Sequence, residues 1–234
     1  MPKHGKQFKN VHAKVDRTKL YTVDEGIETV LSTCYAKFDE TFDIAMKLGV
    51  DPRHADQMIR SSVSLPNGTG KVTRVLVFAK GAKVQEALDA GADFAGSDEL
   101  VEKIQGGWLE FDKTVATPDM MGIVGKIGRV LGARNLMPNA KLGTVTMDVA
   151  SVVKEIKGGK VDFRVDKAGI IHAGIGKVSF GKEKIKENFV TFAQRILQLK
   201  PSTSKGIYFR SITISSTMGP GVKLDTIDVR SELR

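Results

Sequence analysis

The sequence has a single cysteine, Cys34, among 234 residues, and no apolar run approaches the roughly 18 residues that a membrane helix needs. One cysteine excludes an internal disulfide and is typical of a protein in a reducing compartment. The first 19 residues are polar and basic and contain no apolar stretch, so they do not resemble a secretory signal. We therefore expect a cytoplasmic protein that makes no membrane contact.

Residues that would support catalysis or metal binding are also scarce. The four histidines are dispersed, and none stands at metal-ligand spacing from another histidine or from the cysteine. No pair of a nucleophile and its base can be assembled from neighbouring motifs. The adjacent acids Asp39 and Glu40 precede an expected strand, where such residues usually face water. The sequence thus predicts no metal, no cofactor and no enzymatic activity.

Two glycine-rich stretches invite comparison with nucleotide-binding loops. SVSLPNGTGK ends in Gly70 and Lys71, but Leu65 and Val72 replace the first glycine and the hydroxyl residue of a P-loop. MGIVGKIGRVLG has glycines three or four apart, whereas a dinucleotide-binding fingerprint needs two glycines separated by one residue. We interpret the second stretch as a smooth helix surface on which a neighbouring element packs. Its glycines are Gly122, Gly125, Gly128 and Gly132.

What the sequence has in excess is positive charge, and this charge is unevenly distributed. The net charge is +9. Residues 72–158 hold 11 basic and 11 acidic side chains, so the whole excess lies in the two flanking segments. Such an asymmetry indicates a polyanion-binding part and a neutral part. A basic surface that only maintains solubility is the alternative.

The hydrophobic pattern changes at the same boundaries. TFDIAMKL, residues 41–48, alternates between polar and apolar positions, which predicts a half-buried antiparallel strand. Between residues 72 and 158, short apolar strands alternate with helices, as in a parallel α/β sheet. After this segment, VDFRV and IIHAGIGKVSF predict a hairpin, a helix follows to Leu199, and we expect a strand to close the chain.

The simplest architecture joins these observations into two domains. One is a split α+β domain built from residues 1–70 and 159–234, and the other is an inserted Rossmann-like α/β domain over residues 71–158. Three consecutive units are the alternative, which we favour less because each flank alone is short for a hydrophobic core. We expect a hinge where the chain crosses between the domains. The candidate hinge residues are Gly68, Gly70, Gly158 and Gly159.

Three loops in the basic flanks indicate which polyanion is bound. KFDET places a cation and an aromatic residue beside hydrogen-bonding groups, the turn at residues 166–169 carries Lys167 and Gly169, and the uncharged SSTMGPG combines small hydroxyl residues and glycines with a methionine. Such loops can approach a folded RNA closely, bond its phosphates and 2′-hydroxyls, and pack apolar groups on sugars or bases. Each loop alone is also typical of an ordinary turn.

Five stretches in unbroken order resemble the bacterial ribosomal protein L-one family, which belongs to the mobile stalk of the large subunit. They are KFDETFDIAMKLGVDPRHADQMIR, SVSLPNGTGK, MMGIVGKIGRVLGARNLMPNAKLGTVT, FRVDKAGIIHAGIGKVSF and STMGPGVKLD. The resemblance implies a split RNA-binding domain with a Rossmann-like insertion. It also implies three partners: large-subunit ribosomal RNA, the deacylated tRNA that leaves the exit site, and the family's own messenger RNA, whose translation is repressed. We expect the free chain to be a monomer.

Carried over motif by motif, the resemblance implies RNA contacts from ten residues of the flanks. They are Lys37, Phe38, Thr41, Lys167, Gly169, His172, Ser211, Thr217, Met218 and Gly219. Two competing interpretations remain. A nucleotide-binding α/β enzyme would need a ligand at the inserted domain, and an RNA-binding or protein-binding scaffold would act outside the ribosome.

Overall fold

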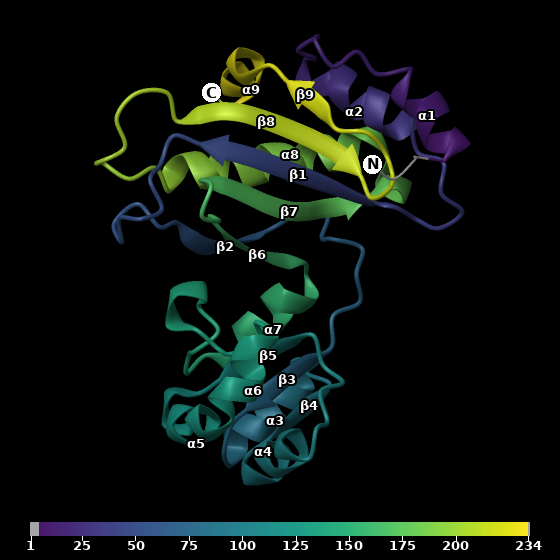
Figure 1. The fold of residues 1–234 in the computed structure, drawn as a ribbon. Helices are drawn as coiled ribbons and strands as arrows, with labels where there is room; N and C mark the ends of the chain where they lie inside the picture. Colours follow the sequence, from purple (N-terminus) through teal and green to yellow (C-terminus); the bar gives the residue numbers. More distant parts are fainter. Residues whose placement is uncertain (1–4, 234) are drawn as a thin grey trace. The chain divides into compact units, whose positions relative to one another are not determined.

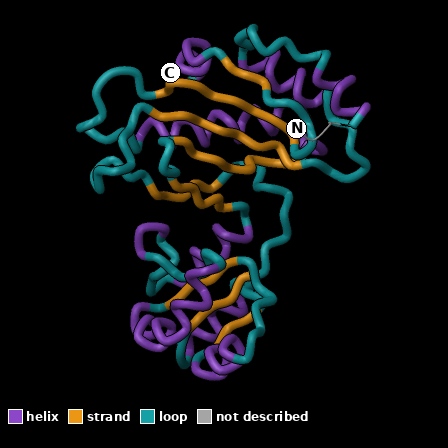
Figure 2. Tube along the Cα trace, viewed as in Figure 1, coloured by secondary structure: helices purple, strands orange, loops and turns teal. Residues whose placement is uncertain are grey.

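The computed structural model describes residues 5–233, which form a mixture of helices and sheets (Figure 1, Figure 2). The chain divides into two compact units: unit 1 comprises Met1–Gly70 and Val161–Arg234, and unit 2 comprises Lys71–Lys160. The second crossing lies two residues later than the sequence suggested, because Gly158 and Gly159 complete the last turn of a helix. That each unit is a separately folding domain remains a prediction. Among the described residues, no helix is long and apolar enough to span a bilayer.

Unit 1 is built around a four-stranded antiparallel sheet of order β7–β1–β8–β9. Its strands are β1 (Thr41–Leu48), β7 (Ile170–Lys177), β8 (Phe209–Ser216) and β9 (Val222–Leu224). The predicted alternation along β1 is confirmed, since Phe42, Ile44 and Met46 are at most 1% exposed. Strand β1 comes from the first segment of the chain and lies between two strands from the last segment (Figure 1).

Helices α2 (Val23–Ser32) and α8 (Gly181–Gln198) cover the apolar face of this sheet, with Ile27 and Phe189 fully buried in the shared core. Thr22 caps α2, because its hydroxyl accepts the Glu25 N–H at 3.3 Å. Two short helices, α1 (Lys6–His12) and α9 (Thr226–Glu232), complete unit 1. Within residues 5–233, no helix covers the opposite face of the sheet (Figure 1).

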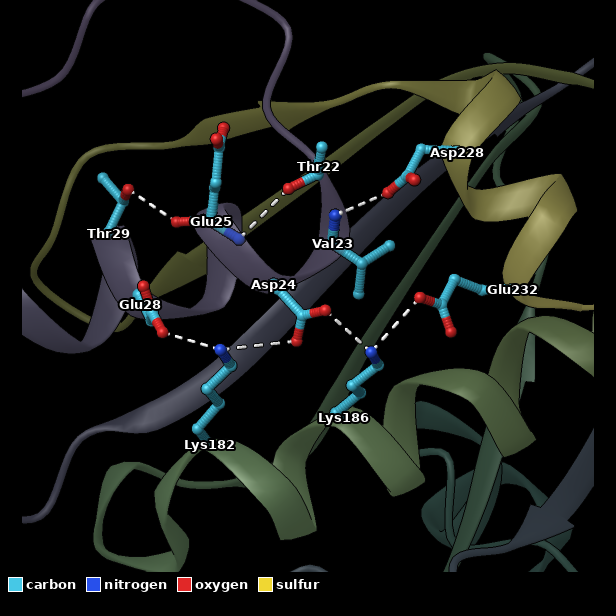
Figure 3. A network of polar contacts seen from close by, with 10 residues as sticks. All are labelled: Thr22, Val23, Asp24, Glu25, Glu28, Thr29, Lys182, Lys186, Asp228 and Glu232. Carbon is cyan, nitrogen blue, oxygen red and sulfur yellow. Dashed lines mark hydrogen bonds and ion pairs between the residues drawn. The ribbon is translucent and has the colours of Figure 1, made fainter.

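A polar network joins the two ends of the chain to α8 (Figure 3). The Lys186 ammonium lies 2.8 Å from Asp24 of α2 and 3.2 Å from Glu232 of α9. Lys182, one turn earlier, pairs with Glu28 at 2.6 Å. Exposed ion pairs of this kind contribute about 0–1 kcal/mol each, so the network orients the helices more than it stabilises them.

Two predictions about unit 1 differ from the structure. Of the predicted hairpin, only the turn and one antiparallel bridge between Val165 and Ile171 are formed, whereas strand β6 (Lys160–Arg164) pairs with β2 (Arg60–Ser64) in a separate two-stranded sheet. Phe163 of β6 packs edge-on against Phe192 of α8, with ring centroids 5.3 Å apart, so core packing directs β6 away from β7. The chain also ends in helix α9 rather than in a strand, because the Asp225 side chain caps that helix and Val229 of the helix is buried in the core.

Unit 2 contains a three-stranded parallel sheet of order β4–β3–β5. Its strands are β3 (Val75–Phe78), β4 (Phe94–Gly96) and β5 (Lys113–Ala116), and its helices are α3 (Ala82–Asp89), α4 (Asp98–Gln105), α5 (Met121–Val124), α6 (Gly128–Ala133) and α7 (Val149–Lys157). Val75 and Val77 pack with α3 and α7, whereas Leu76 and Phe78 pack with α4, α5 and α6. Because β3 is buried on both faces, its sequence is a continuous apolar run.

The interpretation of the glycine stretch as a packing surface is wrong. A Cβ atom added at Gly122, Gly125 or Gly132 would meet no heavy atom within 4 Å outside its own helix. The core-facing positions of this stretch are taken by Val124 and Ile127, so Gly122, Gly125 and Gly132 lie on the outside, and only Gly128 would meet a neighbour, the Met137 side chain at 3.8 Å. The stretch is also no continuous helix, because a 3-10 turn over Gly125–Ile127 separates α5 from α6.

The glycines at the two crossings differ in conformation. Gly68 and Gly70 have positive φ values of 65° and 69°. Asn188, fully buried in α8, donates to the Gly68 carbonyl at 2.9 Å, so the chain is held on unit 1 up to this point. At the second crossing, Gly158 is helical and Gly159 ends α7 with a φ of 99°.

The hinge prediction can be tested with distance labels on the two units. Because few residues on each side of the crossings need to change conformation, we expect a broad or RNA-dependent distance distribution, with motion on microsecond to millisecond timescales. Double electron–electron resonance on the full chain would measure it. One narrow distance, identical with and without RNA, would contradict the hinge.

The independence of unit 1 gives a second prediction. When a short glycine linker replaces residues 72–158, we expect unit 1 to unfold cooperatively and to keep most RNA affinity, because its core is self-contained and the residues that remain carry the whole charge excess. Thermal unfolding and filter binding would measure both properties. A loss of more than about tenfold in affinity at about 200 mM salt, or roughly 1.4 kcal/mol, in a folded variant would contradict the prediction.

Candidate nucleic-acid interface

The ten residues implied as RNA contacts all lie in unit 1 and form three groups. The first group lies where β1 begins and β8 ends and consists of Lys37, Phe38, Thr41, Thr217, Met218 and Gly219. His172 and Ser211 occupy the sheet face opposite the core. Lys167 and Gly169 lie in the turn before β7. The structure thus brings the six residues of the first group together from opposite ends of the sequence.

A buried carboxylate holds the first group in place. Glu40 is only 2% exposed, whereas the sequence suggested that both Asp39 and Glu40 face water. One carboxylate oxygen accepts the N–H groups of Tyr35 and Ala36 at 3.2 and 3.0 Å, and the other accepts the N–H of Met218 at 3.0 Å. This arrangement, which we call the Glu40 clamp, ties the segment before β1 to the loop after β8.

The clamp also sets the protonation state of its carboxylate. Burial by itself raises the pKa of Glu40, but hydrogen bonds from Ser216 and from the backbone N–H groups of Met218, Ala36 and Tyr35 outweigh it. The pKa therefore lies below its ordinary value. Because every donor favours the ionised form, the clamp is complete at neutral pH.

Hydroxyl groups extend the pairing of β1 and β8 beyond the last strand residue. The Thr41 N–H donates to the Thr217 hydroxyl at 2.9 Å. The Lys177 ammonium donates to the Thr41 hydroxyl at 3.0 Å. A Cβ atom at Gly219 would lie 2.5 Å from the Ser216 hydroxyl oxygen, so a larger residue would displace the hydroxyl that accepts the Gly219 N–H. The loop of residues 216–219 is therefore fixed before any ligand arrives.

The rigid loops present apolar side chains to solvent. Phe38 is 55% exposed and Met218 is 46% exposed, although both lie beside well-ordered hydrogen bonds. Lys37, next to Phe38, is exposed too. A flat ring, a flexible thioether and a cation on one rim are suited to contacts with bases, sugars and phosphates.

The uncovered sheet face continues this surface with small polar groups. In the strand register, His172, Ala45 and Thr213 form one row, and Lys47 and Ser211 form the next. Asp43 lies in a third row opposite Ser215. Burial raises the pKa of the Asp43 carboxyl above its ordinary value, although the positive charge of Lys177 opposes this shift.

The turn before β7 forms the third group. The Asp166 carboxylate accepts the N–H groups of Ala168 and Ile170, both at 2.8 Å. The Ile170 N–H makes the largest contribution to lowering the pKa of Asp166, and His172, with its Nε2 atom 3.6 Å away, lowers it further. Gly169 has a φ of 78°, and its carbonyl accepts the Leu48 N–H at 2.8 Å.

A groove adjoins this turn. It is lined by Pro52, Arg53, Met58, Arg164, Val165, Asp166 and Lys167. We call it the Arg53–Arg164 groove.

Sequence reasoning missed several residues of this interface. Glu40, Lys177 and Thr213 were not among the implied contacts. The alternation of β8 contains the signal for Thr213, because every second residue of a strand faces one side. The roles of Glu40 and Lys177 depend on partners far away in the chain. Among the described residues, no cluster of metal-binding side chains accompanies the site.

Comparisons with known proteins identify the family of the chain. The model of the ribosomal protein L1p/L10e family matches residues 30–220. Three proteins named large ribosomal subunit protein uL1 are similar to the chain over nearly its whole length. The protein from Desulfotalea psychrophila is 72% identical over 231 residues, which cover 99% of this chain and 98% of the relative. The protein from Syntrophobacter fumaroxidans is 63% identical, with 99% of both chains covered, and that from Desulfosudis oleivorans is 58% identical, with full coverage of both.

The Glu40 clamp predicts a pH-dependent stability. Glu40→Gln places an NH₂ group against backbone donors, so we expect unit 1 to lose about 1–3 kcal/mol of unfolding free energy at pH 7. The difference from wild type should persist above the ordinary glutamate pKa of about 4.3. It should shrink as the pH falls through the lowered pKa of folded Glu40, where the wild-type carboxylate becomes protonated.

Urea unfolding of the two proteins between pH 3 and pH 7 would measure this difference. Glu28→Gln, which removes an exposed carboxylate from an ion pair with Lys182, is the matched control and should cost no more than about 1 kcal/mol. Equal stability of Glu40→Gln and wild type at pH 7 would show that the clamp does not stabilise the loops.

Proposed function

Because the chain belongs to the ribosomal protein L1p/L10e family, we propose that unit 1 binds large-subunit ribosomal RNA through the loops of the Glu40 clamp and the uncovered sheet face. Membership of this family makes the protein a structural constituent of the large ribosomal subunit, ribosome-bound in the cytoplasm, and not an enzyme. The proposal assigns the RNA binding that the family implies to particular residues.

The Glu40 clamp is the observation that carries the proposal. It holds Phe38 and Met218 outward on backbone segments that are already hydrogen-bonded, so little conformational entropy is lost when RNA binds. The hydroxyl-rich sheet face beside these side chains suits the 2′-hydroxyls and sugar edges of RNA. Lys37 and Lys167 supply charge at the two ends of the surface.

The same surface would also bind the protein's own messenger RNA. A messenger that mimics the ribosomal site presents the same groups, so the two RNAs compete for one surface. When ribosomal RNA is scarce, the free protein would occupy the messenger and repress its translation. This assignment requires that one set of substitutions weakens both complexes equally.

Exit-site tRNA needs a different surface, because it must bind while ribosomal RNA occupies the first one. We assign it to the Arg53–Arg164 groove, which shares only Lys167 with the ribosomal RNA surface. Arg53 and Arg164 are exposed there, and arginine binds phosphate through two parallel hydrogen bonds. A stalk protein that holds both RNAs at once would carry tRNA out of the exit site as the stalk moves.

Three substitutions separate shape recognition from charge attraction. Thr217→Val removes the hydroxyl that positions Thr41, and we expect it to weaken binding to ribosomal stalk RNA by about 1–3 kcal/mol. Met218→Ala should also weaken it, because Met218 uses only its backbone N–H in the clamp and its side chain is free to contact RNA. Neither change should alter the salt slope, whereas Lys167→Ala should make it shallower by about 0.7–0.9, as for one phosphate contact.

Salt titrations on ribosomal stalk RNA, on the messenger site and on scrambled RNA would measure these effects. Met147→Ala in unit 2, which truncates a methionine of similar exposure, is the matched control and should bind as wild type. Wild-type affinity of both Thr217→Val and Met218→Ala for stalk RNA would mean that the loop is only a turn. Loss of stalk RNA binding without loss of messenger binding would refute the shared surface.

The tRNA assignment gives a separate prediction. In the preformed complex with stalk RNA, the double variant Arg53→Gln/Arg164→Gln should make the salt slope of tRNA binding shallower by about 1.4–1.8, the loss of two phosphate contacts. Its affinity for stalk RNA should not change. Lys9→Gln/Lys14→Gln, with the same loss of charge on exposed positions elsewhere, is the control. The groove is not the tRNA site if both double variants behave alike.

A further inference from the structure

Unit 2 is nearly neutral in sum, but its charges are segregated along the chain. Residues 84–112, which span most of α3 through α4, hold eight acidic side chains and one basic side chain. Residues 120–147, which contain α5 and α6, hold four basic side chains and no acidic one. A net charge near zero therefore conceals a basic region, and charge summed over the whole unit does not exclude contact with a polyanion.

Three of these cations are exposed on the segment of α5 and α6. Lys126, Arg129 and Arg134 point away from the core, whose positions are filled by Ile127 and Leu131. We call the surface of these three cations the α5–α6 face. Within residues 5–233, no ion pair or side-chain hydrogen bond engages any of the three cations.

Other charges of unit 2 do find partners. Asp112 lies 3.0 Å from Lys71, and Asp93 lies 2.6 Å from Lys157. The fold therefore pairs some charges of this unit and leaves the cations of the α5–α6 face available. Arginine with a free guanidinium is suited to bidentate contacts with phosphate.

We propose that the α5–α6 face binds the phosphate backbone of the same ribosomal RNA molecule that unit 1 recognises. This inference rests on the proposed function, because unit 1 must first hold the RNA. The two units belong to one chain, so RNA bound to unit 1 is presented to unit 2 at an effective concentration of about millimolar. A weak electrostatic contact is then sufficient. A free tRNA would have to bind this small face without such help.

The composition of the face favours RNA over a protein partner. Hot spots of protein interfaces are enriched in tryptophan and tyrosine. Residues 120–147 contain no aromatic side chain. The exposed glycines at positions 122 and 125 leave the backbone accessible between the cations, which lets a phosphate strand approach closely.

The test uses the full chain with Lys126, Arg129 and Arg134 all changed to glutamine. We expect the salt slope of binding to stalk RNA to become shallower by about 1–2, so that the loss of affinity is about 4–16 times larger at 50 mM than at 200 mM salt. The control changes Lys80, Lys103 and Lys154 to glutamine, which removes the same charge from exposed positions elsewhere in unit 2. The control should keep the wild-type slope.

Gly125→Ala is a second variant, and a loss of RNA affinity in it cannot be attributed to misfolding. Gly125 has helical dihedral angles, and its added Cβ atom meets no other part of the chain, so alanine should leave unit 2 at least as stable as before. We expect it to weaken stalk RNA binding about two- to fivefold through steric contact with the RNA.

The outcomes distinguish this inference from the proposed function. If the triple variant matches wild type or the control at every salt concentration, the α5–α6 face does not bind this RNA. If the triple variant instead loses affinity only for free tRNA, or only for an acidic protein, the inference is also overturned. Met218→Ala is measured in the same titration, and its wild-type affinity would refute the interface on unit 1 rather than the α5–α6 face.

Discussion

The pairing of β1 with two strands from the other end of the chain is the constraint on which unit 1 depends. Strand β1 is hydrogen-bonded to β7 on one side and to β8 on the other, and its apolar side chains form the centre of the core. The core is therefore incomplete until both ends of the chain have met. The same pairing places residues 37–41 beside residues 216–219, so fold stability and the formation of the interface have one origin.

The candidate interface illustrates how an acidic residue can serve a surface that we propose binds a polyanion. Glu40 lies beneath the surface, where its charge is satisfied by backbone N–H groups from both segments. An exposed carboxylate at this position would repel phosphate. A buried and fully bonded one organises the loops, and the cations and hydroxyls remain outward. Removing one partner of such a network leaves buried donors unpaired, which costs more than the bonds contribute.

Net charge proved informative for unit 1 and misleading for unit 2. The excess of positive charge in the flanks coincides with the part that holds the ten implied RNA contacts. In unit 2, a sum near zero suggested a neutral surface, but acidic and basic side chains occupy different helices. Electrostatic attraction acts over about one Debye length, roughly 8–10 Å, so local charge on one face matters more than the total.

The sequence by itself determined the elements whose signals are local. The alternation of β1, the cap of α2 and the doubly buried β3 were all predictable, because side-chain periodicity follows directly from strand and helix geometry. The motifs of the loops also indicated residues such as Thr217 and Met218. Only the tertiary structure decided that Glu40 is buried, that β6 pairs with β2, and that Gly122 and Gly125 face outward. Each of these depends on a partner far away in the chain or on the lack of one, and local periodicity contains no information about which distant groups meet.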